Sequence, residues 1–157
     1  MQTVSIGVIH SPFKDASGVP IQAVFAPQAQ GEVEVFPEYR QGLQDLEGFE
    51  RVWLIYWFDR QEGVRLRVRP FRDDRERGLF ATRAPCRPNP IGISPVRLLR
   101  LEDGRLYVAG IDVLDGTPLL DIKPYCRQFD AFPESRSGWL ETSENTRTRS
   151  DNRFAGP

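Results

Sequence analysis

The sequence is poor in histidine, cysteine and lysine, and it lacks a long apolar segment. Two cysteines, Cys86 and Cys126, are too few for a disulfide framework, and a single histidine, His10, excludes a His-rich metal site. The longest strongly apolar run, Val52–Phe58, has seven residues, whereas a membrane helix needs roughly 20. The N-terminus shows no secretory signal pattern. These absences predict a cytoplasmic protein with reduced thiols and no membrane partner.

The common nucleotide-binding loops are missing as well. The chain contains neither a G-x-x-x-x-G-K-[S/T] phosphate loop nor a G-x-G-x-x-G turn. Its 157 residues, 39% of them hydrophobic, have the size and composition of one globular domain. We therefore expect a single folded domain that does not bind nucleotides through either of these two loops.

Positive charge is carried almost wholly by arginine and is concentrated in one segment. The chain has 19 arginines but only two lysines, Lys14 and Lys123. Residues 60–87 hold nine of the arginines against four acidic side chains, although the whole chain has a net charge of −1. Arginine binds phosphate and carboxylate groups through paired hydrogen bonds and stacks on bases. By charge alone, a solvated surface of ordinary ion pairs is the more frequent explanation of such a segment, and an anionic partner is the alternative.

Hydrophobic periodicity favours strands over helices. In Val64–Arg69, for example, apolar residues alternate with three arginines, a pattern with the period of a strand, and Asp103-Gly104 between two apolar runs indicates a hairpin. We expect strands at 3–10, 32–36, 51–58, 64–69, 79–82, 95–101 and 106–113, and one helix at 37–46. The run 51–58 is typical of a strand covered on both faces. The pattern predicts a mainly β protein, a small barrel or sandwich with one or two short helices.

Composition separates a folded part from a polar end. We expect a single domain over residues 1–140 and a polar tail over 141–157 that contains one aromatic residue, Phe154. Such a tail is disordered in isolation or becomes ordered by docking on this subunit or another.

Three clusters carry candidate chemistry. In the first, Ile9–Phe13 and Val19–Gln22, prolines stiffen a polar loop whose backbone groups can meet a flat ligand such as adenine; a well-made turn is the alternative. In the second, residues 80–93, three prolines fix the chain close to Arg83 and Arg87. This rigidity lowers the entropic cost of holding an anion.

The third cluster, Asp112–Tyr125, contains three carboxylates, a lysine and a tyrosine. A turn and a salt bridge account for part of this cluster, but Asp112 interrupts an apolar strand. A Mg²⁺ site at Asp112 and Asp115 is an alternative. Cysteine catalysis at Cys86, between Pro85 and Arg87, is another.

The three clusters, in this order and spacing, resemble the TsaA-like/TrmO family. The resemblance covers Ile6 to Tyr125 and rests on four pieces of sequence. These are Ile6–Phe13, Gly42–Phe49 leading into Trp53–Phe58, Phe80–Arg83 with Arg87–Gly92, and Asp112–Tyr125. The strings Arg-Pro-Asn-Pro-Ile-Gly and Asp-Gly-Thr-Pro followed by Asp-Ile-Lys-Pro-Tyr are long and specific. The best-known members are S-adenosylmethionine-dependent methyltransferases that N6-methylate threonylcarbamoyladenosine next to the anticodon in tRNA.

The resemblance implies a single β-barrel with flanking helices, a homodimer, and S-adenosyl-L-methionine bound near the subunit interface. The cofactor-binding residues that it implies are Pro20, Ile21, Gln22, Asp59, Arg60, Arg83, Ile93, Asp112, Val113, Leu114 and Asp115. Asp59 departs from the family, in which histidine is common at that place. Some members also carry a further C-terminal domain. If that domain contributes to tRNA binding, Arg147, Arg149 and Arg153 of the tail are the candidates that replace it, and another RNA or a smaller adenine-containing molecule is the alternative substrate.

The residue chemistry suggests a role for each group. Arg83 suits the carboxylate of the cofactor, and Asp112 or Asp115 suits its ribose or ammonium. The candidates for a base that takes the N6 proton are Asp121, Asp112 and Tyr125.

The acceptor has its own expected partners. Arg87 and Lys123 are expected to bind the carboxylate of the modified adenosine, and Arg65, Arg67 and Arg69 to bind phosphates of the tRNA anticodon loop.

Two rival functions remain. One is a non-catalytic module that binds S-adenosylmethionine or RNA in a regulatory role, and the other is a metal-dependent hydrolase.

Overall fold

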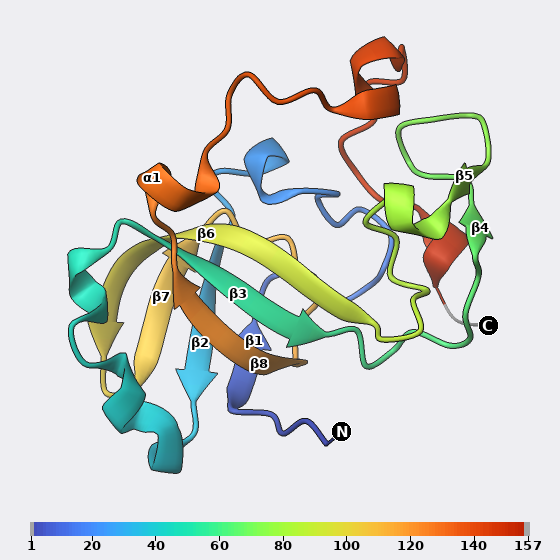
Figure 1. The fold of residues 1–157 in the computed structure, drawn as a ribbon. Helices are drawn as coiled ribbons and strands as arrows, with labels where there is room; N and C mark the ends of the chain where they lie inside the picture. The colour runs from blue at the N-terminus through green and yellow to red at the C-terminus, as the bar shows by residue number, and fades with distance from the viewer. Residues whose placement is uncertain (1, 156–157) are drawn as a thin grey trace.

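The computed structural model describes residues 2–155, so residue 1 and residues 156–157 of the predicted tail lie outside it. Six antiparallel strands close a barrel in the order β1–β2–β7–β6–β3–β8 (Figure 1). These strands are β1 (Gly7–His10), β2 (Gln30–Val35), β3 (Arg51–Trp57), β6 (Ile91–Glu102), β7 (Arg105–Ala109) and β8 (Thr117–Pro124). The prediction of a mainly β protein built on one small barrel is confirmed.

A two-stranded sheet lies beside the barrel. It consists of β4 (Arg67–Val68) and β5 (Arg77–Gly78), and it has its own small buried cluster of Val68, Leu79, Ala84 and Cys86. The remaining elements are the helix α1 (Arg127–Asp130) and the 3₁₀ helices Ala23–Phe25, Pro37–Leu43, Leu46–Gly48, Leu79–Ala81, Gly138–Thr142 and Asn152–Phe154. Across residues 2–155, none of the helices has the length and apolarity required to cross a membrane.

The barrel interior is filled by side chains from all six strands, with every second residue along a strand facing inward. In β3, Val52, Leu54 and Tyr56 are buried, whereas the residues between them are only half-buried. The expectation that this strand is covered on both faces was therefore wrong, because the outer face of the barrel is only partly covered. The predicted hairpin between β6 and β7 is present, with positive φ at Asp103 and Gly104, as a two-residue hairpin turn requires.

Several predicted elements differ from the structure. The strand expected at 64–69 is reduced to the two residues of β4, and Val64 and Leu66 are exposed, because only Val68 reaches an apolar cluster. Residues 79–81 form a 3₁₀ helix instead of a strand, and the helix expected at 37–46 is split into two 3₁₀ turns. β8 was not predicted as a strand, because its prolines and charged residues hide the period of two.

Strands β3 and β6 approach each other closely near one end of the barrel. Gly92 of β6 lies opposite Tyr56 of β3, and a Cβ atom at Gly92 would lie 2.1 Å from the Tyr56 ring. The glycine of the Arg-Pro-Asn-Pro-Ile-Gly string therefore leaves the space in which this ring lies.

Replacing Gly92 by alanine is expected to lower the free energy of unfolding by about 1–3 kcal/mol, because the buried ring has to move. Chemical denaturation measures the effect. Gly42→Ala is the matched control, since no atom outside its chain neighbours and its own helical turn lies within 4 Å of the added methyl group. We expect it to change stability by less than about 0.5 kcal/mol. Equal stabilities of the two variants would show that Tyr56 does not depend on this space.

Candidate functional site

A cavity of about 500 Å³ lies where residues 14–22 (the Pro20 loop), one end of the barrel and the loop between β4 and β5 meet. Five stretches of the chain contribute to its lining, and they fall within residues 14–22, 56–71, 82–93, 112–117 and 150–155. The three clusters singled out in the sequence thus meet at one place, although they are far apart along the chain.

Most of the residues expected to bind a cofactor line this cavity. Ten of the eleven do so, namely Pro20, Ile21, Gln22, Asp59, Arg60, Arg83, Ile93, Asp112, Val113 and Leu114. Arg87 and one of the three candidate bases, Asp112, also line it. The structure does not place Asp115 in the lining.

A direct hydrogen bond joins the first of the three sequence clusters to the second. The Nη1 atom of Arg83 donates to Oε1 of Gln22 at 2.5 Å, and Nε2 of Gln22 donates to the carbonyl of Ile21 at 2.6 Å. The Arg83 side chain is therefore directed towards the Pro20 loop across the cavity lining. Its remaining guanidinium donors are available for an anionic or carbonyl group of a ligand.

A chain of three side chains leads from the barrel interior to the cavity. Ser94 Oγ donates to Oδ1 of Asp112 at 2.5 Å, and Tyr56 Oη lies 3.0 Å from Ser94 Oγ. Because the single hydroxyl hydrogen of Ser94 goes to Asp112, Tyr56 has to be the donor to Ser94. Burial raises the pKa of Tyr56 and the nearby Asp112 charge adds to this, so the phenol keeps the hydrogen that this arrangement needs.

The position of Asp112 changes its acidity. Burial raises the pKa of Asp112 from an ordinary value of 3.8 to about 6, although the hydrogen bond from Ser94, backbone amides and the Arg83 charge act in the opposite direction. Most Asp112 side chains are therefore ionised at neutral pH, while the conjugate acid forms readily. A carboxylate with these properties is suited to accept a proton in a general-base step.

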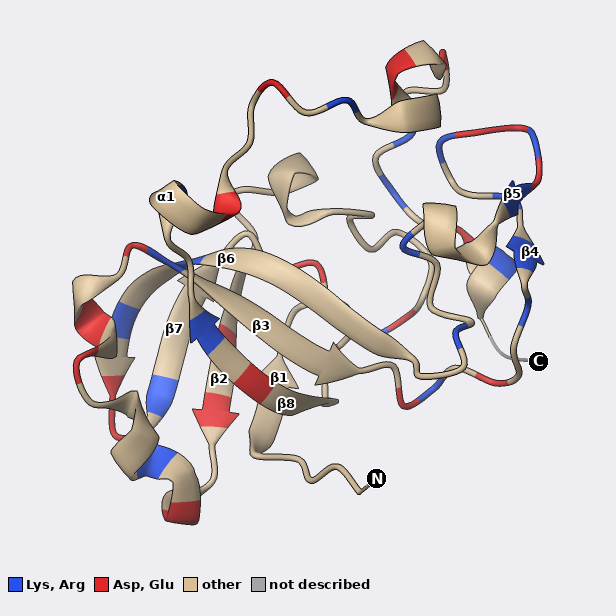
Figure 2. Ribbon diagram, in the orientation of Figure 1, with Lys and Arg blue, Asp and Glu red and all other residues tan. Residues whose placement is uncertain are grey.

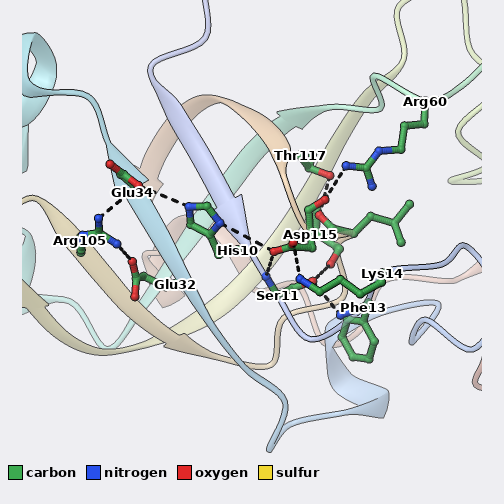
Figure 3. Close-up of polar contacts among 12 residues, drawn as sticks. His10, Ser11, Phe13, Lys14, Glu32, Glu34, Arg60, Arg105, Asp115 and Thr117 are labelled. Carbon is green, nitrogen blue, oxygen red and sulfur yellow. Dashed lines mark hydrogen bonds and ion pairs between the residues drawn. The ribbon is translucent and has the colours of Figure 1, made fainter.

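Asp115 has a different role, which is to fasten the loops around the cavity (Figure 3). Its carboxylate accepts from the backbone amide of Ser11 at 3.0 Å and from Lys14 Nζ at 2.5 Å, and its carbonyl accepts from Arg60 Nη2 at 2.5 Å. Lys14 and the Ser11 amide hold the pKa of Asp115 below its usual range. Asp115 thus connects three segments of the chain and is a structural residue in this geometry.

Arg87 also has structural partners. Its Nη1 atom donates to the carbonyl of Thr82 at 3.0 Å and more weakly to the carbonyls of Leu79 and Ala84. The guanidinium lies 5.6 Å from the centre of the Phe80 ring. Much of the Arg87 donor capacity is therefore used to fold the proline-rich loop on which Arg83 is presented.

The other predicted site residues do not line the cavity. Asp121 and Lys123 form an ion pair on β8 at 3.0 Å, and Tyr125 packs against Trp53 with ring centres 5.8 Å apart. The arginines Arg65, Arg67 and Arg69 lie on and beside β4, where basic residues are frequent (Figure 2). The structure therefore separates Asp121, Lys123 and Tyr125 from Asp112 within one chain.

Some cavity residues were not found by sequence reasoning. Tyr56 was hidden in an apolar run, where only the period of two places it inside the barrel, and Phe71 carries no motif. Phe154 was noted as the one aromatic residue of the tail, yet nothing in its local sequence indicated contact with the cavity.

The metal alternative finds no support in the arrangement of carboxylates. Asp112 bonds to Ser94, whereas Asp115 pairs with Lys14. Among residues 2–155, no three histidine, cysteine or acidic side chains converge in a way that would hold a metal ion.

Comparison with known proteins identifies the family. The family described as the tRNA-methyltransferase O N-terminal domain matches residues 8–131. The chain belongs to this family. The resemblance seen in the sequence motifs is thereby confirmed.

Curated relatives in the family carry two kinds of name. A "Probable S-adenosyl-L-methionine-binding protein" of Pyrococcus abyssi is 51% identical over 151 residues, which are 95% of this chain and 82% of that protein. The "tRNA (adenine(37)-N6)-methyltransferase" of Escherichia coli is 35% identical over 152 residues, which are 90% of this chain and 65% of that enzyme.

A solved TrmO structure has the same fold. The TrmO crystal structure from Pseudomonas aeruginosa superposes with a TM-score of 0.74 at 41% identity. The match covers 88% of this chain but only 62% of the solved one. The chain therefore spans less than two thirds of the E. coli enzyme and of the solved TrmO chain.

The burial of Asp112 predicts a pH dependence of stability. Since its folded pKa lies above the ordinary value, its contribution to the free energy of unfolding is complete below pH 4 and falls as the pH rises to about 6. The decrease is at most roughly 3 kcal/mol. Asp112→Asn should abolish this decrease, as measured by urea denaturation between pH 4 and 7.

The control is Asp121→Asn, because it removes a carboxylate that lies outside the cavity and is partly exposed to solvent. If Asp112→Asn and the wild-type chain lost stability in parallel over this pH range, Asp112 would not be held in a desolvated position.

Proposed function

We propose that this chain binds S-adenosyl-L-methionine in the cavity and N6-methylates threonylcarbamoyladenosine next to the anticodon in tRNA. The observation that carries the proposal is the convergence of Gln22, Arg83 and Asp112, from three distant motifs, on one cavity. The names of the relatives agree with it, since they are called S-adenosyl-L-methionine-binding proteins and a tRNA methyltransferase.

The residues present fit the proposed cofactor. A volume of about 500 Å³ lies within the range of roughly 300–1,000 Å³ that is usual for small-ligand sites. Ile21, Ile93 and Leu114 offer apolar surface for an adenine ring. Arg83 offers paired donors for a carboxylate, and Asp59 offers a negative charge for an ammonium group.

When bound, S-adenosyl-L-methionine would supply an electrophilic methyl group: a carbon–nitrogen bond would form to N6 as the carbon–sulfur bond breaks, and the electron pair of the broken bond would stay on the departing thioether sulfur. We assign the role of general base, which removes the proton from N6, to Asp112. Asp112 lines the cavity, whereas Asp121 and Tyr125 do not. Ser94 and Tyr56 orient the Asp112 carboxylate through the hydrogen bonds described above. Placing the acceptor close to the methyl group supplies most of the remaining rate enhancement.

Methyl transfer is tested directly by mass spectrometry. The purified chain is incubated with S-adenosyl-L-methionine and tRNA that carries threonylcarbamoyladenosine, and the digested nucleosides are analysed. We expect the modified nucleoside to gain one methyl group, with a rate that rises with pH up to about 6 and then levels off. Asp112→Asn should lower kcat by roughly 10²-fold or more while the cofactor still binds.

Arg83→Ala should instead weaken cofactor binding in calorimetry, and Arg97→Ala on the barrel surface is its matched control.

A second candidate is a binding module without turnover, which the name of the Pyrococcus relative favours. Cofactor binding without any methyl transfer to this tRNA would contradict the methyltransferase proposal and support that module.

Arginines are frequent on the two-stranded sheet and in the loop between its strands, where acidic residues also occur (Figure 2), and these arginines are the candidates for contact with the tRNA. Arg67 and Arg69 are exposed, and the only ion-pair partner found for Arg67 among the described residues is Glu76, at 3.5 Å. Arg65 is partly engaged, because it donates to the carbonyl of Arg153 at 3.1 Å. We infer that Arg67 and Arg69 contact phosphates near the modified adenosine.

The double variant Arg67→Ala/Arg69→Ala should bind tRNA more weakly and with a smaller salt dependence. Losing two phosphate contacts lowers the slope of log K against log salt by about two. Fluorescence anisotropy at several salt concentrations measures the slope. Arg97→Ala/Arg100→Ala removes the same charge from the barrel, and an equal effect of both pairs would argue against a localised tRNA surface.

A homodimer is the assembly that the family resemblance implies. The outer face of the barrel supports this proposal, because Ile91 and Ile93 of β6 are each more than 40% exposed and lie opposite Trp57 and Ile55 of β3. An apolar surface of this kind is typical of subunit interfaces. Ile93 also lines the cavity, so the proposed interface would adjoin the cofactor.

A further inference from the structure

The C-terminal segment, defined here as residues 145–155, returns across the molecule to the cavity (Figure 1). It pairs with the Pro20 loop through an antiparallel bridge between Pro20 and Arg149. Backbone hydrogen bonds join Gly18 to Ser150 at 3.0 Å, Ile21 to Thr148 at 3.0 Å and Ser150 to Val19 at 2.8 Å. One side of the segment is therefore joined to the loop that carries the first motif.

The other side of the segment is fixed to the two-stranded sheet. Phe154 packs against the buried cluster of this sheet and meets Phe71 edge-on, with ring centres 5.1 Å apart. Arg153 donates to the carbonyl of Pro70 at 3.0 Å, and the carbonyl of Arg153 accepts from Arg65. Phe154 is therefore the main apolar anchor of the segment.

Between these two attachments the segment forms part of the cavity surface. Ser150, Asp151, Phe154 and Ala155 all line the cavity. The match to the family domain ends at residue 131, so this wall lies beyond the part of the chain that the family domain covers. The cavity is closed on this side by residues from outside the matched region.

The negative charge of Asp151 on this wall is paired with two arginines of the same segment. Asp151 accepts from Arg153 through Nη2 at 2.7 Å and from Arg147 at 2.6 Å, and these guanidinium groups, chiefly that of Arg153, lower the pKa of Asp151 to about 2. The carboxylate therefore stays ionised over the physiological pH range, and its ion pairs join Arg147, Asp151 and Arg153 within the segment.

We propose that the C-terminal segment, anchored by Phe154, is an integral wall of the cofactor site and that cofactor affinity depends on its docking. This inference rests on the proposed function, because the ligand is S-adenosyl-L-methionine. If only the docked form binds, the apparent Kd rises in inverse proportion to the docked fraction.

Calorimetric titration of the full-length chain with S-adenosyl-L-methionine tests the proposal. Phe154→Ala removes the anchor, so we expect the Kd to rise about tenfold if the docked fraction falls to about one tenth. Phe154→Leu should restore much of the affinity, because it retains an apolar side chain. Phe132→Ala is the matched control, since it removes an aromatic residue that is 70% exposed and absent from the cavity lining.

Hydrogen exchange separates undocking of the segment from general unfolding. In Phe154→Ala the amides of Ile21 and Ser150 should exchange faster, while those in β3 stay protected. Wild-type affinity in Phe154→Ala together with fast exchange at these amides would overturn the wall proposal alone, and so would unchanged exchange and affinity. A wild-type chain that does not bind S-adenosyl-L-methionine at all would overturn the proposed function and, with it, this inference.

Discussion

The arrangement of the site depends on the contacts that Asp115 makes at one end of the closed barrel. A closed barrel leaves no free strand edge on which loops can pair, so the loops at its end need other partners. Asp115 supplies them through its carboxylate, which holds Ser11 and Lys14, and through its carbonyl, which holds Arg60. His10 and Glu34 extend these contacts to β2 (Figure 3). Because of this one residue, three segments that line the cavity keep a fixed relation.

The cavity itself combines two kinds of environment. On the barrel side, Tyr56 and Ser94 are buried, and the desolvation that they share raises the pKa of Asp112. On the side of the two-stranded sheet, arginines are abundant, yet many donate to backbone carbonyls, as Arg87 and Arg153 do. Arg83, whose described hydrogen-bond partner is a neutral side chain, is therefore the arginine best suited to meet an anionic group of a ligand. Desolvation and a single directed guanidinium, more than overall charge, define this site.

Motif and periodicity predicted the barrel, and most of the cofactor-binding residues that the motifs indicated line the cavity. Clean alternation located β2, and the family motifs led to Arg83 and Asp112. The same reasoning assigned Asp115 to the ligand, because spacing along the chain does not show which carboxylate faces inward and which binds a neighbouring loop. β4 was overestimated, since alternating arginines have the period of a strand whether or not a partner strand is long enough. The contribution of Phe154 depends on a tertiary contact with residues more than 60 positions away, and no local pattern encodes it.

The central claim is that the cavity between the Pro20 loop, Arg83 and Asp112 seats the cofactor. Nuclear magnetic resonance of the labelled chain, titrated with S-adenosyl-L-methionine, tests this claim most directly. We expect the largest amide shift changes at Ile21, Ile93 and Leu114, which line the cavity. Shift changes concentrated instead on the second pocket, lined by residues 134–141, or on the outer face of β8, would contradict it.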